Sequence, residues 1–271
     1  MIDKISLTCN FEPNYTYMDL HGDTSEDPYR VRLYKYICNL DFATVMYKPH
    51  KFSPELNDRI KFSKVDINPK RFSCYSEMWA YLDSLFREYD SPFDILPESF
   101  NVTRVDIAVD LENFNIKHIL SSLHVKNIRD ESLSFYKGTI YAGTDPKIRI
   151  YNKIAEIKNR IRKHKEITAY EQHLLDSGKE YTRFEIQKRT DNLNLKKLTE
   201  NFEELSSYFD RIEFFSLQEN CSCSVMQFLY KQINRKFRNN LECFKNLQII
   251  PDLKDRYIKS AREWFSLKEP F

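Results

Sequence analysis

Two stretches of the sequence share one local pattern, in which a basic, an apolar and an acidic residue are followed by isoleucine. They are Arg104–Ile107 and Arg183–Ile186. Both lie where apolar and polar residues alternate, which is typical of strands with one buried face, so Asp106 and Glu185 fall on the polar side. Carboxylate oxygens are the ligands that Mg²⁺ and Mn²⁺ prefer. A metal site is one interpretation, and pairing of each carboxylate with the arginine beside it is the other.

A tyrosine at the end of a short strand is the second candidate for chemistry. In the stretch 148–151 the isoleucines take the core side, which leaves Arg149 and Tyr151 on the opposite face. A basic helix that begins near Lys153 follows, and a helix N-terminus can hold a phosphate. A phenol can attack phosphorus when a cation lowers its pKa or a base takes its proton. The alternative is that Tyr151 only packs.

Basic residues are concentrated in one segment, although the net charge of the chain is only +2. Residues 1–100 carry 12 basic and 16 acidic side chains, whereas residues 101–271 carry 30 and 24. The basic segment is 147–165. It contains one acid, Glu156, and the bases Lys147, Arg149, Lys153, Lys158, Arg160, Arg162, Lys163 and Lys165. A phosphate-binding surface and a solvated helix face both fit this run.

The order of elements needed to position these residues predicts an α+β fold. Strands are predicted at 5–11, 29–38, 42–47 and 60–67 and a helix at 78–89, which together make an N-terminal β-rich region, 1–100. A βαββαβ core, RRM-like or ferredoxin-like with a central antiparallel sheet, is predicted at 101–210. Its first and last strands lie side by side in such a fold. Its elements are strands at 102–110, 133–136, 139–142 and 181–189 and helices at 116–123 and 152–175. An extra strand beside the central hairpin is predicted at 148–151, and a further helix at 195–205. Residues 211–271 are predicted to be helical, with apolar stripes at 225–233 and 253–265.

Composition excludes several classes of protein and site. The four glycines, Gly22, Gly138, Gly143 and Gly178, cannot form a Walker A loop or a dinucleotide-binding fingerprint. Two of them frame the predicted hairpin before Tyr151. The six cysteines form no pair of C-x-x-C motifs, and the six histidines form no H-x-H or H-x-x-x-H pair. Without an apolar run of membrane-spanning length or a signal peptide, we expect a cytoplasmic protein.

Four motifs in register resemble the Rep_trans family, the replication initiators of staphylococcal-type rolling-circle plasmids, together with related conjugative relaxases. The motifs are Thr103–Asp110, Gly138–Gly143, Arg149–Lys153 with Glu156, and Tyr181–Ile186. The resemblance covers about 101–189 and implies an HUH-endonuclease-like enzyme that nicks and closes DNA. After Gly143 the chain departs from the family, because Thr144–Lys147 is shorter and carries an acid.

The resemblance also implies roles for individual residues. Tyr151 is the implied nucleophile, with Tyr141 as its rival, and it forms a 5′-phosphotyrosyl link that frees a 3′-OH. Asp106 and Glu185, with Asp110 or Glu156, are implied ligands of Mg²⁺ or Mn²⁺. The candidate DNA-binding residues are Arg149, Lys153, Lys158, Arg160, Arg104 and Arg183.

The implied partners are the double-stranded origin with its extruded or single-stranded nick site, a second copy of the chain and a host helicase. The C-terminal helices are candidates for origin recognition or dimer contact. Alternatives are a relaxase of an integrative conjugative element with the same chemistry, a hydrolytic nuclease that uses water as nucleophile, and a non-catalytic RRM-like module that binds single-stranded nucleic acid. Carboxylates on the central strands argue against the plain binding module, which instead displays aromatic residues there.

Overall fold

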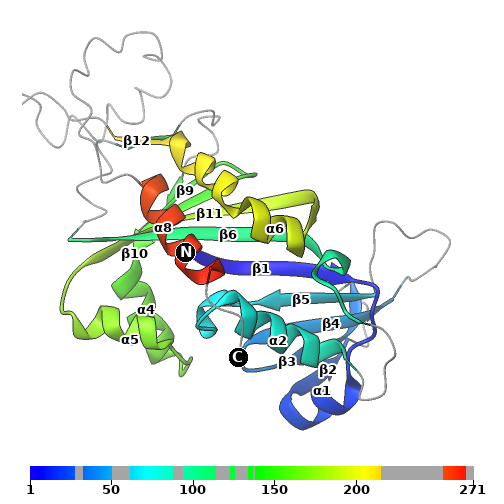
Figure 1. Ribbon diagram of the computed structural model, residues 1–271. Coiled ribbons are helices and arrows are strands. Elements are labelled where there is room, and N and C mark those ends of the chain that lie inside the picture. Colours follow the sequence, from blue (N-terminus) through cyan, green and yellow to red (C-terminus); the bar gives the residue numbers. More distant parts are fainter. Residues whose placement is uncertain are drawn as a thin grey trace, which may run out of the picture. The chain divides into compact units, whose positions relative to one another are not determined.

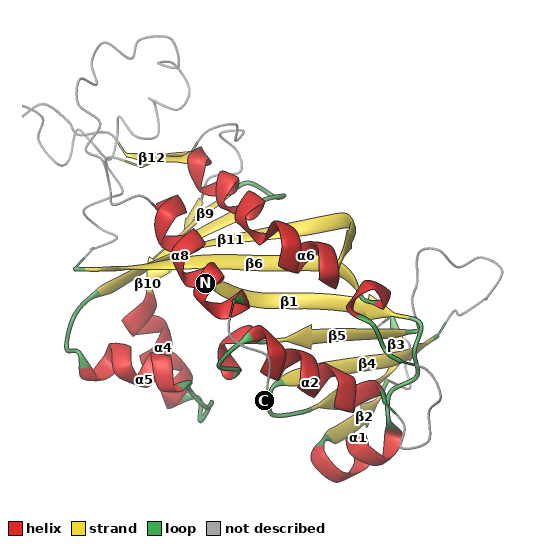
Figure 2. Ribbon diagram, in the orientation of Figure 1, coloured by secondary structure: helices red, strands yellow, loops and turns green. Residues whose placement is uncertain are grey.

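The computed structural model describes residues 1–27, 33–50, 62–87, 94–113, 123–125, 134–136, 138–214 and 253–266. Helices combine with a large antiparallel sheet, which confirms the predicted α+β class (Figures 1 and 2). The chain divides into two compact units. The first comprises Met1–Ile107, Lys188–Phe202 and Ser260–Phe271, and the second Ala108–Gln187 and Glu203–Lys259. The division into 1–100, 101–210 and 211–271 stays a prediction.

The first unit is built on a run of strands in the order β2-β3-β4-β5-β1-β6. Their bounds are β1 Ile2–Cys9, β2 Asp23–Glu26, β3 Tyr34–Asn39, β4 Ala43–Pro49, β5 Ser63–Ile67 and β6 Asn101–Glu112. Helix α2 (Tyr75–Phe86) lies over β3, β4 and β5 (Figure 1) and buries Met78, Leu82 and Leu85, the stripe that the 3.6-residue period predicts. Helix α1 (Tyr15–His21) and strand β2 were not predicted.

The second unit continues from β6 in the order β6-β11-β10-β9-β8. These strands are β8 Ser134–Tyr136, β9 Thr139–Ala142, β10 Lys147–Asn152 and β11 Tyr181–Asn194, and β7 (Leu123–Val125) pairs separately with β12 (Ile212–Phe214). The helical segments are α4 Lys153–Arg162, α5 Ala169–Asp176, α6 Leu195–Asn201, a 3₁₀ stretch Phe202–Arg211 and α8 Leu253–Phe265. Strands β6 and β11 and helix α8 contribute residues to both units.

The predicted strand alternation of the second unit is confirmed by its register. Ile140, Ile150 and Phe184 lie opposite one another on β9, β10 and β11, and all three are buried. Because cross-strand partners share a face, the residues between them form the opposite, polar face. Gly138 and Gly143 flank β9 with positive φ angles of 78° and 72°, a conformation that glycine adopts without strain.

The prediction of one long helix at 152–175 is wrong, because the structure has two helices there, α4 and α5. The chain leaves α4 through His164, whose φ is 54°, and Thr168 begins α5 with a capping box to Glu171. The second helix brings the chain back, so β10 and β11 pair antiparallel instead of being joined as the parallel strands of a βαβ unit.

The remaining predicted elements have mixed outcomes. The first and last strands of the predicted core, β6 and β11, are neighbours, as expected. The helix predicted at 116–123 lies outside the described residues except at Leu123, which begins β7. The apolar stripe at 225–233 lies outside them entirely, whereas the stripe at 253–265 is helix α8.

Candidate active site

Two rows of polar side chains cross the second unit on the face opposite its core. Tyr141, Arg149 and Glu185 lie in register on β9, β10 and β11. Thr139, Tyr151 and Arg183 form the adjacent row. The sequence therefore placed Arg149, Tyr151 and Glu185 correctly on one polar face. We call Asp110, Arg149, Tyr151, Arg183 and Glu185 the polar cluster.

The hydroxyl of Tyr151 donates a hydrogen bond to Glu185 Oε2 at 2.8 Å. Arg149 Nη1 donates to the other oxygen, Oε1, at 2.9 Å, and its guanidinium lies 5.1 Å from the centre of the Tyr151 ring. Tyr151 is only 7% exposed and Glu185 only 2%. Burial, followed by the charge of Glu185, raises the pKa of Tyr151, while Arg183 and Arg149 act in the opposite direction. At neutral pH the resting phenol is therefore protonated and has its proton acceptor in place.

A buried ion pair stands beside this phenol. Arg183 Nε donates to Asp110 Oδ1 at 2.6 Å, and Nη2 donates to Oδ2. Tyr170 of α5 donates to Asp110 Oδ2 at 2.9 Å. Burial alone would lower the pKa of Arg183, but the carboxylate of Asp110 outweighs it, so the pKa is raised and the guanidinium stays charged. The cluster thus holds a fixed positive charge close to the oxygen of Tyr151.

The rival nucleophile, Tyr141, lies on the same face, in register with Arg149. Its side chain is half-buried, and two cations face its ring: Lys147 Nζ at 5.1 Å and the Arg149 guanidinium at 5.9 Å from the ring centre. Tyr141 is therefore more accessible to a DNA strand, whereas Tyr151 has the hydrogen-bonded carboxylate. The choice between the two tyrosines stays a prediction.

The other predicted metal ligand, Asp106, belongs to the first unit. Arg104 donates two hydrogen bonds to its carboxylate, from Nε to Oδ1 at 2.7 Å and from Nη2 to Oδ2 at 2.5 Å. Pairing with the arginine beside it, the alternative raised by the sequence, therefore occurs at Asp106. Glu185 instead forms an ion pair with Arg149, because Arg183 forms its ion pair with Asp110. That Asp106 and Glu185 are adjacent stays a prediction, since they belong to different units.

Each carboxylate that was predicted to bind a metal ion is hydrogen-bonded to an arginine in the described residues. Each of Asp106, Asp110 and Glu185 accepts hydrogen bonds from an arginine at one or both of its oxygens. Across the described ranges, no three His, Cys, Asp or Glu side chains gather as a possible metal site. A divalent cation could replace an arginine only by breaking these bonds, so we derive no catalytic step through a metal.

The predicted DNA-binding residues differ in how exposed they are and in whether they form ion pairs within the protein. Lys153 is 2% exposed, and its ammonium donates to Glu156 at 2.7 Å and to Glu171 at 2.8 Å. Arg160 also donates to Glu171, at 2.6 Å. Arg104 and Arg183 hold Asp106 and Asp110, as described above. Arg149 is partly exposed, and Lys158 is exposed and has no ion-pair partner among the described residues.

Two residues of this region were missed by the sequence reasoning. Glu171 is the centre of the bonds that fasten α4 to α5, and Tyr170 closes over Asp110. The spacing of Thr168 and Glu171, S/T-x-x-E, is a readable signal for a helix start. Nothing in the sequence pointed to Tyr170, because one tyrosine among 17 carries no signal of its own.

Comparison with known proteins found one family. Residues 73–212 match the Phage_CRI family, described as the N-terminal part of a replication-associated protein, and this range includes β6 and β8 to β11. No curated protein and no solved structure matched the chain. Among the described residues, no helix is long and apolar enough to cross a membrane.

Proposed function

Because the chain belongs to the Phage_CRI family of replication-associated proteins, which are rolling-circle replication initiators, we propose that it nicks and rejoins one strand of an origin by tyrosine transesterification. The observation that carries the proposal is the buried hydrogen bond from the Tyr151 hydroxyl to Glu185 inside the matched range. A phenol held 2.8 Å from a carboxylate has its general base within proton-transfer distance.

The proposed step begins with transfer of the phenolic proton from Tyr151 to Glu185. The phenolate oxygen then attacks the scissile phosphorus, and a phosphorus–oxygen bond forms as the bond to the 3′-oxygen breaks. The 3′-oxygen leaves and becomes a 3′-OH by taking up a proton, and the 5′-phosphate stays on Tyr151. Arg149 and Arg183 stabilise the phenolate, since both lower the pKa of Tyr151. The phosphotyrosine keeps a phosphodiester bond, so attack by a 3′-OH reverses the step and rejoins the strand.

A DNA strand can reach Tyr151 only if the polar face opens, because the ring is buried in the resting protein. Arg149, which is partly exposed and lies against both tyrosine rings, is the group best placed to bind the scissile phosphate. Movement of Arg149 from Glu185 to the phosphate would release this carboxylate to act as the base. The partial exposure of Tyr141 beside the same arginine supports the entry of DNA there.

The metal requirement remains part of the proposal. Mg²⁺ is commonly held by one or two carboxylates together with phosphates of the substrate, so the absence of a three-carboxylate group among the described residues does not argue against it. The proposed transfer step does not use this ion, because Glu185 acts there as the base and arginines hold the carboxylates of Asp106 and Asp110.

The finer features implied by the Rep_trans resemblance are also proposals: origin binding, a homodimer and recruitment of a helicase. A conjugative relaxase would use the same step on different DNA.

The test is to find the covalent product. The protein is incubated with labelled single-stranded oligonucleotides that cover the DNA flanking its gene, with Mg²⁺, Mn²⁺ or EDTA, and is analysed on a denaturing gel. We expect a protein–DNA band that depends on the divalent ion and falls to background in Tyr151→Phe. The matched variant Tyr141→Phe keeps the band. A band that persists in Tyr151→Phe and disappears in Tyr141→Phe would move the nucleophile to Tyr141, and cleavage without any adduct would indicate hydrolysis.

A further inference from the structure

A cavity of about 320 Å³ opens between the start of α4 and the segment that joins α5 to β11. All of its lining residues belong to the second unit, and none is part of the polar cluster. They are Asn152, Ile154, Ala155, Lys158, Leu175, Gly178, Lys179 and Glu180. The cavity therefore begins at the residue after Tyr151 but is a separate space.

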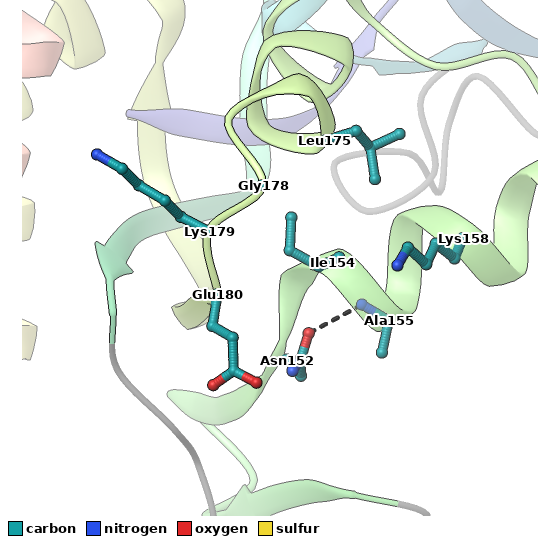
Figure 3. A pocket seen from close by; sticks show the side chains of 8 residues that line it. All are labelled: Asn152, Ile154, Ala155, Lys158, Leu175, Gly178, Lys179 and Glu180. Carbon is teal, nitrogen blue, oxygen red and sulfur yellow. Dashed lines mark hydrogen bonds between the residues drawn. The ribbon is translucent and has the colours of Figure 1, made fainter.

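One side of this cavity is an apolar wall with firm backing. Figure 3 shows Ile154 and Leu175 pointing into the space from α4 and from the end of α5, with Ala155 beside them. Ile154 and Leu175 both pack against the buried cluster Ile157, Leu174 and Tyr181. Because Asn152 caps α4 through a 2.8 Å bond from the Ala155 amide, the first turn of the wall is also fixed. A flat apolar ligand would meet a preformed surface.

The charged groups of the lining are distributed unevenly. Lys179 donates to Glu112 at 2.7 Å and points away from the space in Figure 3. Lys158 is exposed, has no ion-pair partner within the described part of the chain, and turns its ammonium toward the apolar wall. Glu180 lies at the opposite end, near Asn152. An anionic group would be attracted to the Lys158 end and repelled at the Glu180 end.

The surface beyond Lys158 is also basic. Arg162, Lys163 and Lys165 follow it at the end of α4 and in the loop to α5, and all are exposed. Like Lys158, they have no ion-pair partner in the described ranges, in contrast to Lys153 and Arg160 of the same helix. Chains of phosphates are the ligand that suits a row of unpaired cations next to an apolar recess.

We propose that this cavity binds one nucleotide of single-stranded DNA, with the strand continuing across Arg162, Lys163 and Lys165. The inference rests on the proposed function for the identity of the strand. The base lies against Ile154, Ala155 and Leu175, and its phosphate contacts Lys158. The carboxylate of Glu180 accepts from an amino group on the base edge. The site holds the strand next to the nicking centre without taking part in the chemistry.

The first experiment locates the ligand. Methyl groups of isoleucine, leucine and alanine are isotope-labelled in the full chain, and deoxyadenosine monophosphate or inorganic phosphate is added. We expect the methyl signals of Ile154, Ala155 and Leu175 to shift with the nucleotide and to remain in place with phosphate at the same concentration. Equal shifts with both ligands, or shifts confined to other methyl groups, would overturn the proposal.

The second experiment measures affinity for a fluorescent single-stranded oligonucleotide over a range of salt concentrations. Lys158→Gln should weaken binding roughly fivefold and reduce the slope of log K against log salt by about 0.7, the value for one lost phosphate contact. Ala155→Leu, at an exposed position, should weaken binding by filling the recess without changing that slope. The matched control is Lys35→Gln, a partly exposed lysine of the first unit paired with Glu26. If Lys158→Gln behaves like Lys35→Gln, the proposal is wrong.

The two proposals fail in different ways. If nucleotide shifts the signals of Ile154 and Leu175 but no covalent adduct forms with any DNA, the proposed nicking function is wrong and the proposed binding site is supported. If the adduct forms equally well in the wild type and in Lys158→Gln, and the affinity is unchanged, the nicking function is supported and the proposed binding site is wrong.

Discussion

Arg183 is a cation that the fold keeps almost completely out of water. Its side chain is 1% exposed, and that of its partner Asp110 is 2% exposed. Desolvating both charges is costly, and their mutual bonds, together with the hydrogen bond from the Tyr170 hydroxyl, offset part of that cost. Apolar residues of similar volume would fill a merely structural position at a lower desolvation cost. Arg183 acts on Tyr151, because burial raises the pKa of this phenol and the charge of Arg183 lowers it.

Replacing Arg183 alone should therefore be strongly destabilising. In Arg183→Met the carboxylate of Asp110 is left buried without its cation, and we expect a loss of about 3–5 kcal/mol in the free energy of unfolding. Urea denaturation measures it. The double variant Arg183→Met, Asp110→Leu should lose less than Arg183→Met, since it leaves no buried charge. For comparison, Lys179→Ala breaks an exposed ion pair with Glu112 and should change the stability little. A double variant less stable than the single one would contradict this account.

The identity of the polar residues was readable from the sequence, but their pairing was not. Alternation placed Arg149, Tyr151 and Glu185 on one face, because side-chain direction in a strand follows from its period of two. The partner of each charge depends on the cross-strand register and on what covers the face. Glu185 therefore pairs with Arg149 across the sheet, while Arg183 pairs with Asp110. Neither contact follows from spacing along the chain.

At the scale of elements, the α4–α5 pair is held together by one buried carboxylate. Glu171 accepts from Lys153 and Arg160 of α4 and from the backbone amide of Thr168 at its own helix start. Because α4 begins at Lys153, directly after the last residue of β10, these bonds also fix where β10 ends. The sequence predicted the helical character of this segment. It did not predict the reversal, because the capping residues Thr168 and Glu171 are polar and the break is made by a positive φ at His164.

The stability of this helix pair should depend on pH in the acid range. Burial would raise the pKa of Glu171, but the hydrogen bond and charge of Lys153, the Thr168 amide and Arg160 outweigh it and lower the pKa from 4.5 to about 2. A carboxyl with a lowered pKa in the folded state adds stability that is complete above pH 4.5 and is lost as the pH falls toward 2. At about 1.4 kcal/mol per pKa unit, the loss is about 3 kcal/mol.

The measurement is urea denaturation at a series of pH values for the wild type and Glu171→Gln. The variant should be less stable at pH 7, and its stability should fall less steeply between about pH 5 and 2 than that of the wild type. Parallel pH curves for the two proteins would show that Glu171 is not responsible for the acid dependence.

For the whole molecule, the distribution of charge was more informative than its sum. The excess of basic residues after residue 100 falls partly on buried bonds, as at Lys153, Arg160 and Arg183, and partly on surface positions without an ion-pair partner among the described residues, such as Lys158. Composition alone could not separate these two groups, since burial is decided by tertiary packing. The sequence did predict the α+β class and the adjacency of β6 and β11, because both follow from the order of elements along the chain.

The two compact units should unfold in one transition, because β6, β11 and α8 each contribute residues to both. The two tryptophans, Trp79 and Trp264, both belong to the first unit, where the Trp264 ring lies 6.0 Å from that of Tyr75. Tryptophan fluorescence therefore reports on the first unit alone, whereas circular dichroism reports on both. In Arg183→Met, a change in the second unit, we expect the urea midpoints of fluorescence and circular dichroism to fall together and remain coincident. Lys35→Gln, a substitution within the first unit that removes no buried bond, should leave both midpoints unchanged. A fluorescence midpoint that stays at the wild-type value while circular dichroism becomes biphasic would show that the units unfold independently, and that the strands shared between them do not couple their stabilities.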